Sequence, residues 1–132
     1  MDVDPALLQR VGVKTGAPVM FDEVIALQGL ARFCPVFHRP LFNELGLVTN
    51  RAFETFCSDT IPLLMLPEHV VEKIHGCAAL CLIPGEDLPA RLEDIMHRPE
   101  FYWDAVLKTR SHLEAHHSYE RRFEELMAIL ER

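Results

Sequence analysis

Four polar residues near the middle of the chain, Thr49, Asn50, Arg51 and Glu54, have the types and the spacing to bind a phosphorylated ligand. Residues 50–57 are predicted to form a short helix capped by Thr49 or Asn50, and a helix start presents free backbone N–H groups that suit an anion. Arg51 adds a positive charge, and the Glu54 carboxylate can accept two O–H donors, such as the vicinal hydroxyls of a ribose. The same spacing also fits a surface ion pair between Arg51 and Glu54, worth about 0.2 to 0.5 kcal/mol, and this alternative stays open.

His38 is a second candidate for contact with such a ligand. It directly follows the first apolar run of the chain, at the end of a predicted strand. Open α/β sheets bind ligands at the carboxyl ends of their strands. We therefore expect His38 either to contact phosphates or to be an ordinary loop residue.

The remaining histidines and cysteines do not predict a metal site. His112 and His116 have the spacing of two ligands on one helix face, but no H-E-x-x-H order is present. The four cysteines lie inside apolar segments, which favours reduced, buried thiols over disulfides or metal ligands. We expect no metal and no bound cofactor.

Three short apolar runs are predicted to be the strands that position these residues. Their side chains are apolar at consecutive positions, as expected for parallel strands covered on both faces. Pro35 and Pro62 lie within two of the runs, and proline prefers edges and strand ends. The predicted strands are residues 32–37, 61–66 and 77–83.

Helical patterns alternate with the runs and then occupy the whole C-terminal third. Helices are expected over residues 22–30, 50–57, 67–75, from about 87 to 96, 100–112 and from about 118 onward. Pro67 and Gly76 delimit one of them, and Pro99 separates two others. The expected fold is α/β, a partial Rossmann-like parallel sheet of short strands flanked by helices, in a single domain over residues 1–132.

Composition excludes several classes of function. The chain has 132 residues, a formal net charge of -7 and no cluster of Lys and Arg, so nucleic acid is not expected as a partner. No apolar run approaches the roughly 18 to 20 residues of a membrane span, and the start of the chain does not resemble a signal peptide. These features predict a soluble, cytoplasmic protein.

Two motifs resemble a known enzyme family. The string Glu44-Leu-Gly-Leu-Val-Thr-Asn-Arg-Ala-Phe-Glu54, followed by the apolar run IPLLML, resembles the donor-site segment of group 1 glycosyltransferases related to spore maturation protein CgeB. The C-terminal string His117-Ser-Tyr-Glu-Arg-Arg122 is similar to that family's final helix motif. The resemblance covers roughly residues 20–131.

The resemblance implies a role for each matched residue. Glu54 resembles the residue that holds the ribose of a nucleotide-sugar donor, and the backbone of Thr49, Asn50 and Arg51 resembles a diphosphate cradle. Glu44 resembles the position that contacts the donor sugar. The chain departs from the family's A-x-G-T turn at residues 57–60, where Asp59 would bring a negative charge near a diphosphate.

The family's enzymes have two Rossmann domains, and this chain resembles the latter part of the C-terminal one. We therefore expect the donor-binding part of a glycosyltransferase, with catalytic residues unknown and an N-terminal acceptor domain or a homodimer partner missing. The alternative is a non-catalytic α/β protein-interaction module, or a degenerate relative without donor binding.

Overall fold

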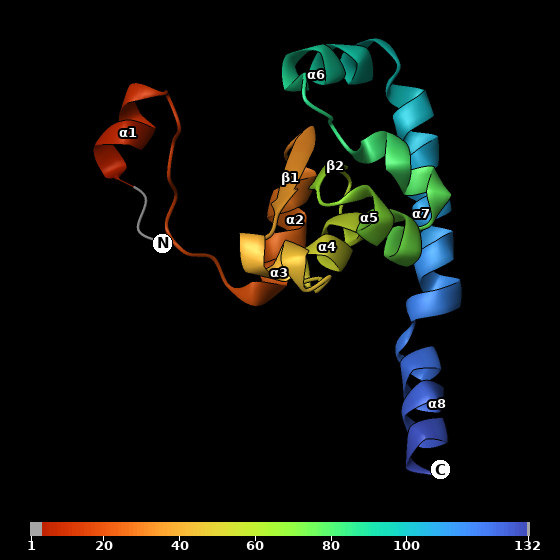
Figure 1. Cartoon of the computed structure of the whole chain (residues 1–132). Coiled ribbons are helices and arrows are strands. Elements are labelled where there is room, and N and C mark those ends of the chain that lie inside the picture. The colour runs from red at the N-terminus through yellow and green to blue at the C-terminus, as the bar shows by residue number, and fades with distance from the viewer. Residues whose placement is uncertain (1–3, 132) are drawn as a thin grey trace.

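The computed structural model describes residues 4–131 and contains a two-stranded parallel sheet surrounded by helices (Figure 1). Strand β1 (Phe33–Phe37) pairs with β2 (Ile61–Met65), and Phe33 lies opposite Ile61. Two of the three predicted strands are therefore confirmed. Both strands are edge strands among the described residues, which explains how they accommodate Pro35 and Pro62.

The prediction of a third strand over residues 77–83 is wrong. Cys77–Leu82 is a 3-10 helix, η3, which packs against α5 (Glu68–His75) and α7 (Pro99–His117). Its backbone groups bond locally instead of to a neighbouring strand; for example, the Ala79 amide donates to the Gly76 carbonyl. The side chains of Ala79 and Leu82 in η3 are buried. A short apolar run indicates burial but does not distinguish a strand from a buried helical segment. The described fold is mixed α/β, and a full Rossmann-like sheet is not seen.

The segment between β1 and β2 contains three short helical elements. They are α3 (Pro40–Glu44), α4 (Arg51–Glu54) and the 3-10 turn η2 (Thr55–Cys57). Together α4 and η2 cover the helix expected over residues 50–57. Because β1 and β2 are parallel, this crossover carries the chain from the end of β1 back to the start of β2.

The helices on either side of the sheet follow local sequence signals. Helix α2 (Val24–Gly29) with the preceding 3-10 turn η1 (Phe21–Glu23) matches the helix expected over residues 22–30. Helix α5 starts after Pro67 and ends at Gly76, whose φ of 81° lies in the left-handed region that favours glycine. Helix α1 (Pro5–Arg10), which was not predicted, stands apart from the sheet in Figure 1.

The C-terminal third is helical, as predicted. Helix α6 (Leu88–His97) is separated from α7 at Arg98, and α7 continues beyond the predicted residue 112 to His117. Helix α8 (Tyr119–Leu130) begins at Ser118, whose side chain accepts a hydrogen bond from the Arg121 amide at 3.3 Å. Figure 1 shows α8 continuing away from the sheet beyond α7. No helix among residues 4–131 is both long and apolar enough to cross a membrane.

The hydrophobic core lies between the sheet and α7. It includes Val36, Leu64, Phe56, Tyr102 and Val106, all at most 2% exposed. Burial of these side chains is the main force that holds the crossover and α7 against the sheet.

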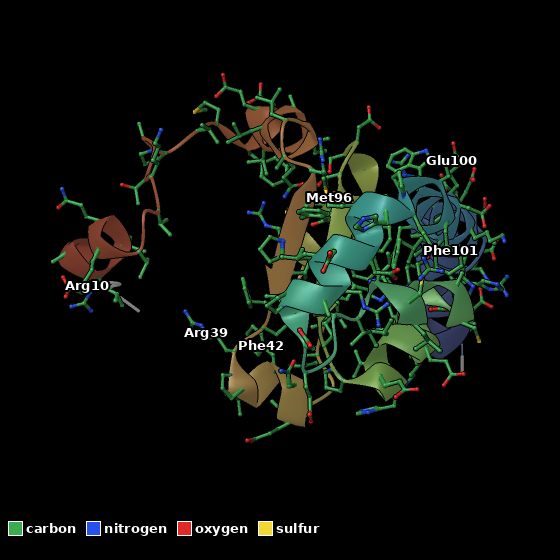
Figure 2. All side chains as sticks on the ribbon, turned by 90° about the horizontal axis from the view of Figure 1, so that it is seen from above. Arg10, Arg39, Phe42, Met96, Glu100 and Phe101 are labelled. Carbon is green, nitrogen blue, oxygen red and sulfur yellow. The ribbon has the colours of Figure 1, made fainter. Side chains whose placement is uncertain are left out.

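Helix α6 lies across the starting ends of the strands. Figure 2, which looks down on this end, shows Met96 of α6 over the sheet. Arg32, just before β1, approaches the Met96 sulfur at 2.8 Å. This end of the sheet is opposite the end at which the crossover to α3 begins.

The cysteines are free, but their predicted burial is only partly correct. Cys34 and Cys81 are half-buried, whereas Cys57 and Cys77 are exposed. Cys77 is exposed because η3 turns one face outward, which a two-sided buried strand would not do.

Candidate functional site

The start of α4 lies at the carboxyl end of β1, because His38 holds it there. Nε2 of His38 accepts a hydrogen bond from the Thr49 amide at 3.4 Å and lies 3.2 Å from the Thr49 hydroxyl. Burial lowers the pKa of His38, which favours the neutral ring that can accept this bond. His38 therefore positions the crossover, and the Thr49 amide is already hydrogen-bonded in this structure.

The α4 segment is a tight local turn of helix. Asn50 precedes it with helical dihedral angles and makes no side-chain cap, and its carbonyl accepts from the amides of Phe53 and Glu54. The Thr49 carbonyl accepts from the Ala52 amide in the same way. The predicted side-chain cap by Thr49 or Asn50 is therefore wrong, because Asn50 continues the helix instead of adopting the extended conformation that a cap requires.

Arg51 and Glu54 form the ion pair that their spacing allowed. Arg51 Nε lies 3.9 Å from Glu54 Oε2, with 47% of the Arg51 side chain and 19% of the Glu54 side chain exposed. The distance is at the long limit for such a pair, and one side of the pair is in solvent, so its contribution to stability is small. Glu54 is thus a half-buried carboxylate with a weak internal partner.

Glu54 lines a cleft of about 520 Å³ that we name the α4–α8 cleft. Its lining comes from three segments of the chain: η1, α4 with η2, and the junction of α7 and α8. The lining residues are Phe21, Asn50, Phe53, Glu54, Cys57, His117, Tyr119 and Arg122. Small-molecule sites occupy roughly 300 to 1,000 Å³, so the cleft has the size of one.

The far wall of the cleft contains an ordered histidine and arginine. Arg122 Nη2 donates to Nδ1 of His117, and Arg122 Nη1 lies 2.6 Å from Glu125 Oε2. Burial and then the charge of Arg122 lower the pKa of His117, which favours the neutral ring. The His117 ring also packs against Phe53, with ring centroids 6.2 Å apart.

A buried histidine, His75, supports the floor of the cleft from behind. His75 is fully buried, and its Nε2 donates to the Ala52 carbonyl at 3.1 Å. Its ring lies 5.8 Å from that of Phe53 and 5.4 Å from that of Phe56. His75 thus ties α5 to α4, and burial lowers its pKa to about 4.

Of the predicted site residues, the structure brings Asn50 and Glu54 to the cleft. Thr49 lies beside it but is bonded to His38, and Arg51 pairs with Glu54. Glu44 is exposed at the end of α3 and is not among the described residues that line the cleft. The residues that sequence reasoning missed are His117, Tyr119 and Arg122, although the His-Ser-Tyr motif followed by arginine already singled out their segment.

Asp59, which stands in the segment where the chain differs from the A-x-G-T turn of the glycosyltransferase family, does not lie at the α4–α8 cleft. It is 85% exposed and lies 3.7 Å from Arg110, which offsets its charge. It lines another cleft, of about 540 Å³, together with Arg32 and Trp103 at the starting ends of the strands. Its negative charge therefore does not line the α4–α8 cleft.

The histidines near the cleft do not form a metal centre. The His112 and His116 rings lie tilted against each other with centroids 4.5 Å apart, and the His112 and His117 ring centroids are 6.1 Å apart. Within residues 4–131 no group of three or more His, Cys, Asp or Glu side chains is arranged to hold a metal ion.

Comparisons with known proteins add no assignment, since the chain matches no protein-family model, no curated protein and no solved structure. The geometry of the cleft and the two sequence motifs are therefore the basis for a functional proposal.

Proposed function

We propose that the α4–α8 cleft binds a nucleotide-sugar donor, and that the chain is the donor-binding part of a glycosyltransferase. One observation carries this proposal: both segments that resemble the family, residues 44–54 and 117–122, contribute side chains to the same cleft. They are far apart in the sequence, and only the packing of α7 against the core brings them together. Segments that share a ligand have a reason to converge in this way.

The chemistry of the lining suits a nucleotide. The Glu54 carboxylate has accepting capacity beyond its weak contact with Arg51 and can take both hydroxyls of a ribose. Phe53 and Tyr119 offer aromatic surface for a base. Asn50 adds an amide that both donates and accepts, which is the kind of group that fixes a ligand's orientation.

A complete glycosyltransferase would need more than the described two-stranded sheet. In the complete enzyme the two strands would belong to a larger Rossmann-like sheet in a cytoplasmic protein, and a separate domain would hold the acceptor. The chemical step would be transfer of the sugar from the nucleotide diphosphate to that acceptor. The donor part would assist by stabilising the negative charge that develops on the leaving diphosphate.

Thermal unfolding with and without nucleotides tests the proposal. UDP, GDP and their sugar conjugates are added in turn, and a ligand at 100 times its dissociation constant adds about 2.7 kcal/mol of stability. We expect one nucleotide to stabilise the wild type and Glu54→Gln to lose that stabilisation. Glu44→Gln is the matched control, because Glu44 is exposed and does not line the cleft. A folded wild type that no nucleotide stabilises at millimolar concentration contradicts the proposal.

The exposed apolar side chains favour a second candidate, a protein-interaction module without donor binding. Helix α8 has no buried residue, and its Phe123, Leu126 and Leu130 are 50% to 70% exposed. Further apolar side chains are exposed on η1 and α2, among them Phe21 and Leu27. Such surfaces commonly mark contacts with another protein or domain. Light scattering that finds a concentration-dependent dimer, together with no response to nucleotides, supports this alternative.

A further inference from the structure

The diphosphate of a bound donor needs a cation that the predicted cradle does not supply. The Thr49 amide is bonded to His38, and the Arg51 guanidinium is drawn toward Glu54 and is not among the described residues that line the cleft. Helix α4 has only four residues, so its dipole contributes little. The charge of the diphosphate therefore has to be balanced elsewhere in the cleft.

Arg122 is the permanently charged cation among the described lining residues of the cleft. Its guanidinium carries five N–H donors, and the contacts with His117 and Glu125 use Nη2 and Nη1. Donors remain for a ligand, and the side chain is 52% exposed, so a phosphate can reach it. The planar guanidinium also suits two oxygens of a phosphate at once.

The contact between Arg122 and His117 requires a neutral imidazole. A guanidinium only donates, so Nδ1 of His117 must accept, and a protonated ring has no acceptor to offer. Protonation would also place two positive charges side by side and turn the guanidinium away. The Phe53 ring on one side of His117 limits how far the imidazole can move in response.

Other titratable groups surround His117. His112 and His116 on α7 and Glu125 on α8 act on its charge. Glu54 shares its cleft, Arg110 and Glu114 line a neighbouring cleft with it, and His75 lies behind Phe53. The positive members of this set oppose its protonation, whereas Glu125 favours it.

We infer that Arg122 is the group in the α4–α8 cleft that binds the diphosphate, and that neutral His117 is the residue that positions it. This inference rests on the proposed function and names the chemistry of one part of the ligand. Glu125 supports the same arrangement from the next turn of α8. Diphosphate binding then weakens when His117 becomes protonated, at a pH below the ordinary pKa of histidine.

Inorganic pyrophosphate, followed by phosphorus NMR titration, tests Arg122 without depending on the base or sugar. We expect Arg122→Gln to weaken binding about tenfold or more, as the loss of charge-assisted hydrogen bonds implies. Arg121→Gln is the matched control, because Arg121 is adjacent, pairs with Glu124 in the same i,i+3 manner and does not line the cleft. Equal weakening by both variants, or no binding to the wild type, overturns the inference.

A pH series on His117 separates positioning from a merely structural role. The side chain of His117→Asn keeps an accepting oxygen and does not titrate, so this variant should bind pyrophosphate as the wild type does at pH 7.5 and lose less affinity on acidification. His117→Ala should bind weakly at every pH. Circular dichroism establishes that each variant is folded. An acid response in His117→Asn equal to that of the wild type overturns the positioning role.

UDP and GDP, titrated in parallel, separate this inference from the proposed function. If pyrophosphate binds through Arg122 while neither nucleotide binds more tightly than pyrophosphate, the anion site stands and the nucleotide proposal fails. If a nucleotide binds the wild type and Arg122→Gln equally well, the nucleotide proposal stands and the inference fails.

Discussion

Nε2 of His75 donates a hydrogen bond to the backbone carbonyl of Ala52 at 3.1 Å, and both residues are completely buried. This contact ties the C-terminal end of α5 to α4, directly behind the aromatic floor of the candidate cleft. The other ring nitrogen, Nδ1, is buried without a partner. A proton on Nδ1 would be buried without an acceptor, so the site favours the neutral ring.

The first prediction concerns pH and His75. Its pKa is about 4 in the folded chain against an ordinary value of 6.5, so between these values the unfolded chain binds the proton more readily. The free energy of unfolding should therefore decrease as the pH falls from about 6.5 to about 4, by about 3 kcal/mol from this residue. Urea unfolding at a series of pH values measures this decrease.

His75→Gln is the control for that series. The glutamine amide can donate to the Ala52 carbonyl and does not titrate, while His38 and His117, whose pKa values burial also lowers, remain in both proteins. The variant should lose a large part of the acid sensitivity. Identical pH dependence in the two proteins would assign the effect to other groups.

The second prediction concerns Gly76, which ends α5 with a φ of 81°. A Cβ at this position would lie 3.0 Å from Cγ and Nδ1 of the His112 ring. Gly76→Ala should therefore cost more than the roughly 1 to 2 kcal/mol of backbone strain alone. Gly85→Ala isolates that strain, since Gly85 has a φ of 74° and open space around it. Chemical denaturation compares the two.

The double variant Gly76→Ala with His112→Ala should regain part of the stability lost in Gly76→Ala, because it removes the ring that the new methyl group meets. Equal costs for Gly76→Ala and Gly85→Ala would mean that the His112 side chain moves aside freely.

The third prediction concerns Arg110, which fastens α7 to the segment that leads into β2. Its guanidinium donates to the carbonyls of Phe56 at 2.6 Å and Ser58 at 2.7 Å, and it lies 5.0 Å from the centre of the Trp103 ring. Arg110→Lys cannot reproduce this fork and should lower the free energy of unfolding by about 1 to 3 kcal/mol.

Lys108→Ala is the comparison for Arg110. Lys108 pairs with Asp104 on the surface of α7, with both side chains more than half exposed, so its loss should cost less than about 1 kcal/mol. Thermal unfolding of both variants measures the difference. A loss in Lys108→Ala as large as in Arg110→Lys would indicate a general effect of charge on α7.

Local signals in the sequence were sufficient for much of the secondary structure. Pro67 and Gly76 bound a helix correctly because proline suits a helix start and glycine a left-handed end, whatever surrounds them. Ser118 likewise marks the start of α8 through a hydrogen bond to its own next turn. The two confirmed strands were recognisable from their apolar runs, although only β2 is buried along most of its length, whereas β1 is fully buried at Val36 and leaves Phe37 65% exposed.

The run at residues 77–83 shows where local signals end. Its apolar side chains predict burial, which is correct for Ala79 and Leu82, but they carry no clear period. The segment forms a 3-10 helix because it packs against α5 and α7. No residue near it in the sequence indicates that packing.

The candidate site divides in the same way. The sequence by itself determined that Arg51 and Glu54 pair across one helical turn, because that distance depends only on helix geometry. Only the tertiary structure decided that the Thr49 amide donates a hydrogen bond to His38. It likewise decided that His117 and Arg122 line the same cleft as Glu54. Those relationships join segments distant in the chain, and they follow from how α7 packs on a common core, which is a property of the whole fold.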